Sequence, residues 1–65
     1  MLSVSEVLMS NHDMTSFGQL VEYVRRCARQ GEIFFEMDLR PPFEDTPDDW
    51  AERLEAAFSS ADNIP

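Results

Sequence analysis

The clearest pattern along the chain is an apolar stripe with helical spacing in residues 16–30. The residues that form the stripe are Phe17, Leu20, Val21, Val24 and Ala28. Ser16 is a preferred N-cap residue, and Gln19 stands three residues later, where it completes a capping box. Gly31 follows the stripe, and glycine commonly ends a helix. The pattern therefore predicts a helix over residues 16–30.

Apolar and polar residues alternate in the next segment, residues 32–39. One side of an extended chain would carry Ile33, Phe35, Met37 and Leu39. The other side would carry Phe34, Glu36 and Asp38. This period of two predicts a strand with one buried and one wetter face. Pro41 and Pro42 end it, because proline cannot donate to the hydrogen-bond ladder of a sheet.

Helical spacing returns after the prolines and predicts a second helix over residues 47–60. Thr46 is placed to cap it, and Pro47 suits the first helical position. Its apolar face would carry Trp50, Leu54, Ala57, Phe58 and Ala61, and its polar face Asp48, Glu52, Glu55 and Ser59. Residues 62–65 are expected to form a frayed tail.

Residues 2–9 fit two patterns. Ser3 and Glu6 have the spacing of a capping box, which favours a short helix. Leu2, Val4 and Leu8 also alternate loosely, as in a strand. A strand here would pair with residues 32–39 and complete a two-stranded sheet. A helix here would leave that strand alone, with unpaired backbone groups that a second copy or a partner must satisfy.

These elements predict one small α+β domain spanning residues 1–65. Two main helices, 16–30 and 47–60, would lie around the strand 32–39. A domain of this length buries a small core and has a thin stability margin. Cys27 is the single cysteine, so an intramolecular disulfide is excluded. The sequence lacks a signal-peptide pattern and a stretch of about 20 apolar residues, so we expect a cytoplasmic protein.

The charge pattern changes this picture most. The net charge is −8, and all five basic residues are arginine. Residues 1–31 carry three acids and three arginines, whereas residues 32–65 carry ten acids and two arginines. Negative charge on this scale repels nucleic acid and anionic lipid, so direct binding to DNA, RNA or a membrane is not expected. A basic protein or nucleoprotein complex is the natural partner.

The densest run of acids lies on and before the second predicted helix. Asp45, Asp48 or Asp49, Glu52 and Glu55 follow at steps of three or four residues, which would align them as a rail of carboxylates about 5–6 Å apart. Like charges at this spacing weaken a helix, so the rail suggests a function. A solvated helix face that keeps the domain soluble is the competing interpretation. The expected partner-binding residues are Phe34, Glu36, Asp38, Glu44, Asp45, Asp48, Asp49, Glu52 and Glu55.

The sequence contains no residue pattern typical of a metal site or a catalytic site. The acidic run lacks the spacing and the turn glycine of a calcium loop, and His12 and Cys27 each stand alone, so neither a metal site nor a cofactor is predicted. A paired acid and base, a nucleophile set and a phosphate loop are all missing from the sequence, which argues against an enzyme. Cys27 lies beside the apolar stripe and is expected to be a packed, unreactive thiol.

The sequence therefore favours a non-enzymatic binding protein that docks on the basic, nucleic-acid-binding surface of a partner and inhibits or modulates it. Small acidic proteins of phages and mobile elements that block restriction or CRISPR complexes have this general character. The comparison is an analogy with that class of proteins and rests on no shared motif. An antitoxin-like neutraliser of a basic toxin shares the same electrostatics. The alternative is a structural or assembly protein, a homodimer or an accessory subunit, that associates through strand 32–39 and apolar surface.

Overall fold

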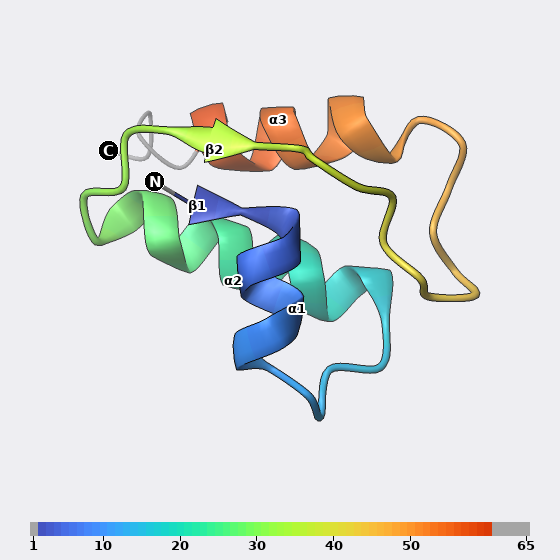
Figure 1. Cartoon of the computed structure of the whole chain (residues 1–65). Coiled ribbons are helices and arrows are strands. Elements are labelled where there is room, and N and C mark those ends of the chain that lie inside the picture. The colour runs from blue at the N-terminus through green and yellow to red at the C-terminus, as the bar shows by residue number, and fades with distance from the viewer. Residues whose placement is uncertain (1, 61–65) are drawn as a thin grey trace.

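A computed structural model describes residues 2–60, which form three helices and a two-stranded parallel sheet (Figure 1). In chain order the elements are β1 (Leu2–Ser3), α1 (Val4–Ser10), α2 (Phe17–Arg29), β2 (Phe35–Glu36) and α3 (Trp50–Ser60). The α+β class predicted from the sequence is confirmed. The predicted tail at residues 62–65 lies outside the described residues.

The N-terminal segment contains both of the structures that its sequence allowed. Leu2 and Ser3 pair in parallel with Phe35 and Glu36, and the chain then turns directly into α1. Ser3 makes this change possible, because its Oγ accepts the Glu6 N–H at 3.2 Å and caps the helix. The expectation that an N-terminal helix would leave the second strand unpaired is therefore wrong. Two residues ahead of the helix are enough to form a sheet.

Strand β2 is much shorter than the predicted strand 32–39. Its pairing partner ends at Ser3, where α1 begins, so only Phe35 and Glu36 have residues opposite them. The prediction of a buried side is wrong for its two outermost residues, Ile33 and Leu39. Ile33 is 75% exposed and Leu39 is 40% exposed, whereas Phe35 and Met37 are half-buried.

Helix α2 begins as its sequence predicts. The Ser16 side chain accepts the Gln19 N–H at 3.2 Å, and the Gln19 side chain accepts the Ser16 N–H at 3.2 Å. The helix ends at Arg29, and Gly31 then adopts a φ of 105°, which glycine tolerates without strain. The local sequence signals at both ends of this helix are confirmed.

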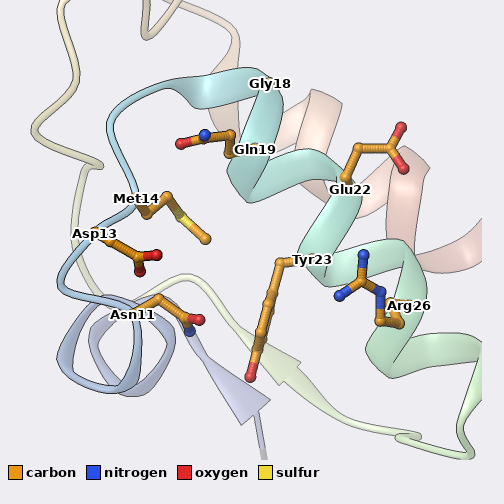
Figure 2. A pocket seen from close by; sticks show the side chains of 8 residues that line it. All are labelled: Asn11, Asp13, Met14, Gly18, Gln19, Glu22, Tyr23 and Arg26. Atoms are coloured by element: carbon orange, nitrogen blue, oxygen red, sulfur yellow. The ribbon is translucent and has the colours of Figure 1, made fainter.

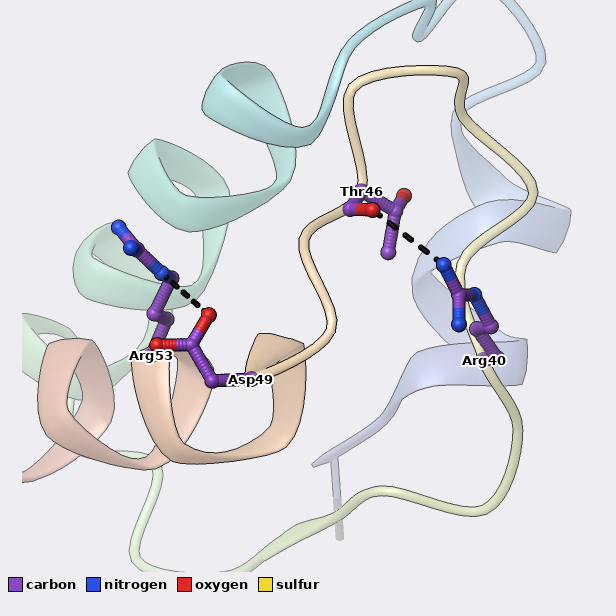
Figure 3. A network of polar contacts seen from close by, with 4 residues as sticks. All are labelled: Arg40, Thr46, Asp49 and Arg53. Carbon is purple, nitrogen blue, oxygen red and sulfur yellow. Dashed lines mark hydrogen bonds and ion pairs between the residues drawn. The ribbon is translucent and has the colours of Figure 1, made fainter.

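Helix α3 begins at Trp50, three residues later than predicted. Thr46 is buried and donates its hydroxyl to the Pro41 carbonyl at 3.3 Å, while its own carbonyl accepts from the Arg40 guanidinium at 3.3 Å (Figure 3). The Thr46 hydroxyl was expected to cap α3, but it instead closes the loop before α3. A single turn, with Trp50 N–H donating to the Pro47 carbonyl at 3.2 Å, comes before the helix.

The core lies where α2 and α3 pack together, with α1 and β1 completing it. Its fully buried side chains include Val4, Val7, Leu20, Val24 and Leu54. Strand β2 joins this core through Phe35, whose ring stacks on Phe58 of α3 with centroids 5.5 Å apart. Trp50 packs on the core cluster, as predicted. None of the helices in residues 2–60 has the length and apolar character needed to cross a membrane.

Candidate functional site

Three of the predicted partner-binding carboxylates have hydrogen-bond partners within the fold, and Asp45 is the first of them. Its Oδ1 accepts the backbone N–H of Phe17, the first residue of α2, at 2.8 Å. The first N–H groups of a helix have no partner within it and carry the positive end of its dipole. Asp45 therefore fastens the loop before α3 to the start of α2.

Asp38 has a similar role at the start of α1. Its carboxylate accepts the Ser5 N–H at 3.2 Å and the Ser5 hydroxyl at 2.5 Å. The hydrogen bond from the Ser5 side chain is the main reason that the pKa of Asp38 lies below its usual 3.8. This side chain ties the segment after β2 to α1.

Asp49 is the third, and it pairs with Arg53 one turn along α3. The Arg53 Nε donates to Asp49 Oδ1 at 2.7 Å (Figure 3). That hydrogen bond, with the charge of Arg53, lowers the pKa of Asp49. The pair is exposed to solvent, so it adds little stability. The positive charge of Arg53 does offset the negative charge of Asp49, one of the carboxylates in the predicted rail.

Replacing Asp38 with alanine should lower stability in a pH-dependent way. The folded-state pKa of Asp38 is depressed, so its contribution is present above the unfolded pKa of about 3.8 and is lost as pH falls through the folded pKa. Wild type should therefore be more stable than Asp38→Ala at pH 6, and the difference should narrow at acid pH. Thermal unfolding at both pH values measures this, and a pH-independent difference would contradict it.

The other acids of the predicted rail have no structural role of this kind. We call Glu44, Asp48, Glu52 and Glu55 the acidic surface. All four are exposed, and none of their side chains makes a hydrogen bond or an ion pair with another residue in the range 2–60. They lie on the loop before α3 and on the side of α3 that faces away from Leu54 and Ala57. Asp48 precedes the helix, because α3 starts at Trp50.

A second exposed feature lies just before β2. Phe34 was expected on the wetter face of the strand, and it is 62% exposed. Sequence reasoning missed its neighbour Ile33, which is the more exposed of the two. The signal that could have revealed it is the short N-terminal partner strand, which leaves Ile33 without a residue paired opposite it. We call these two residues the Ile33–Phe34 patch, and Glu36 lies beside it, also exposed.

An open pocket of about 400 Å³ lies between the loop after α1 and the first turns of α2 (Figure 2). Two of its polar side chains already have structural partners. Asn11 donates to the Val7 carbonyl at the end of α1, at 2.8 Å, and Gln19 belongs to the capping box of α2. Asp13 lies across the pocket from Tyr23. The pocket is lined by Asn11, Asp13, Met14, Gly18, Gln19, Glu22, Tyr23 and Arg26.

Cys27 was expected to be a packed thiol, and its environment agrees with that expectation. It is half-buried, and burial is the main cause that raises its pKa above the usual value, against a lowering hydrogen bond with Tyr23. A raised pKa keeps the thiol protonated and unreactive near neutral pH. Within the part of the chain that the structure describes, no three His, Cys, Asp or Glu side chains come together as metal ligands.

Comparison of the chain with protein-family models, with curated proteins and with solved structures finds no match.

Proposed function

We propose that this protein is a non-enzymatic binding module whose acidic surface docks on a basic, nucleic-acid-binding surface of a partner protein and inhibits or modulates it. One observation carries the proposal. Asp38, Asp45 and Asp49 have partners inside the molecule, whereas Glu44, Asp48, Glu52 and Glu55 have none among the described residues. Carboxylates that the fold does not use remain available for a partner.

The physical cost of this surface supports the same proposal. Glu52 and Glu55 are three residues apart on α3, where side chains are neighbours and like charges destabilise the helix. The cost is offset when a basic surface approaches, because complementary charge speeds encounter and rejects wrong partners. A groove that binds phosphates presents such a basic surface. The proposal includes a cytoplasmic location and assigns no catalytic residue, metal or cofactor.

A homodimer is the second candidate function, and the exposure of Ile33 and Phe34 favours it. A contiguous exposed apolar patch, unlike a single exposed side chain, is typical of a site of association. This candidate expects a dimer at micromolar concentration whose stability does not depend on the acidic surface. Sedimentation of the purified protein as a monomer would exclude the homodimer.

The capture of a partner from an extract of the native cells tests the proposal. The wild-type chain should retain a basic protein at low salt and release it at about 1 M salt, where the screening length falls to about 3 Å. A variant with Glu44, Asp48, Glu52 and Glu55 changed to Lys should capture none of it. Retention that is unaffected by both the salt and the charge change would overturn the proposal.

A further inference from the structure

We infer that the Ile33–Phe34 patch is the apolar anchor through which the same basic partner is held, so this inference rests on the proposed function. The partner must then offer an apolar pocket surrounded by Lys or Arg. Binding sites commonly combine a few buried apolar anchors with a charged rim that gives little affinity. The acidic surface would guide the partner, and the patch would retain it.

The patch is exposed but held in place. The carbonyl of Phe34 accepts the backbone N–H of Leu2 at 3.1 Å, which ties the patch to β1. The next residue, Phe35, points into the molecule and stacks on Phe58. Because side chains alternate along an extended chain, the half-buried Phe35 directs Phe34 outwards, whereas Ile33 precedes the paired residues and is exposed there. An anchor whose backbone is already ordered loses less entropy on binding.

The size of the patch requires a wider contact around it. A large aromatic side chain contributes about 150–250 Å². Phe34 and the smaller Ile33 together fall well short of the roughly 800 Å² that each partner buries in a specific interface. The surface around the patch must supply the remainder, and its exposed neighbour Glu36 is acidic. The occupant must therefore be complementary to carboxylates as well as to apolar groups.

The negative charge around the patch favours a basic partner over a second copy. Two copies would each carry a net charge of −8 and would bring Glu36 towards its own equivalent. Like charges placed across an interface are unfavourable and are not fully screened at short range. A surface rich in Lys or Arg turns the same carboxylate into a favourable contact.

The fold also brings the patch near the acidic surface. Phe35 follows the patch directly and touches Phe58, and Glu55 precedes Phe58 by three residues, about 5 Å along the helix axis. The patch and Glu55 therefore both lie close to the Phe35–Phe58 contact. One partner of ordinary size can contact both.

Two synthetic peptides of equal charge test the inference, one of alternating Lys and Leu and one of alternating Lys and Ser. Wild type should bind the Lys–Leu peptide about tenfold more tightly. The variant Ile33→Ser/Phe34→Ser should lose this preference and keep its affinity for the Lys–Ser peptide. The control Met9→Ser removes another exposed apolar side chain, 70% exposed and outside the patch, and should bind as wild type does.

Amide NMR spectra of wild type with each peptide give a second measurement, which does not depend on whether the double variant folds. The signals of Ile33 and Phe34 should shift with the Lys–Leu peptide only. Equal binding of both peptides by wild type, or a preference that survives in the double variant, would overturn the inference. The inference would also be overturned if wild type is a dimer and the double variant is a monomer, because the patch would then bind a second copy of the chain. If changing Glu44, Asp48, Glu52 and Glu55 to Gln leaves all peptide binding intact, the proposed function fails separately.

Discussion

Replacing Leu54 with alanine should lower the free energy of unfolding by about 2–5 kcal/mol. Leu54 has an exposed fraction of 0% and lies on the inner face of α3, in the core cluster that also contains Leu20 and Val24. Its removal loses apolar burial and leaves a cavity that neighbouring side chains fill only in part. Because a 65-residue domain has a thin margin of stability, the variant should be largely unfolded at 37 °C.

Urea unfolding followed by far-UV circular dichroism measures this loss. The matched control is Glu55→Ala, which changes the next residue of the same helix to the same amino acid on its exposed side. The control should unfold near wild type, because alanine favours helix and Glu55 has no partner among residues 2–60. Equal midpoints for the two variants would show that α3 does not pack as described.

The second large effect concerns the rate of partner binding. Changing Glu52 and Glu55 to glutamine should lower the association rate constant for the captured partner by about tenfold or more at low ionic strength. Long-range attraction between opposite charges speeds encounter, and this attraction disappears at high salt. The rate constants of wild type and variant should therefore converge as salt is added. Surface plasmon resonance across a salt series measures both rate constants.

The matched control for that experiment is Glu6→Gln/Asp13→Asn. It removes the same two negative charges from exposed residues outside the acidic surface. Since steering depends on where the charge lies, this control should keep most of the wild-type rate. Equal losses in the two variants would assign the effect to net charge alone and would contradict a defined docking surface.

The sequence predicts the helices of this protein well where their signals are local. Ser16 and Gln19 form the expected capping box, and Gly31 follows the end of α2 as expected. The start of α3 could not be predicted in this way. The Thr46 hydroxyl is equally suited to cap a helix or to donate to a carbonyl, and its contact with Pro41 depends on how the loop folds. Local pattern does not encode that choice.

The same limit applies to the candidate site. In the sequence, Asp45 and Asp48 are equivalent members of one acidic run. The structure separates them, because Asp45 meets the start of α2, 28 residues away, while Asp48 meets no partner among the described residues. Asp38 is likewise taken by Ser5, 33 residues away. Distant contacts decide which acids are structural and which are available, so a single sequence could not sort them.

The pairing of β1 with β2 has a consequence for the order of folding. The sheet joins Leu2 to Phe35, so its formation closes a loop of about 33 residues, whereas α2 and its capping box need only neighbouring residues. Local structure of this kind forms sooner than distant pairing. The sheet should therefore form after the helices. With so few backbone hydrogen bonds, it should also be among the first parts to open in hydrogen exchange.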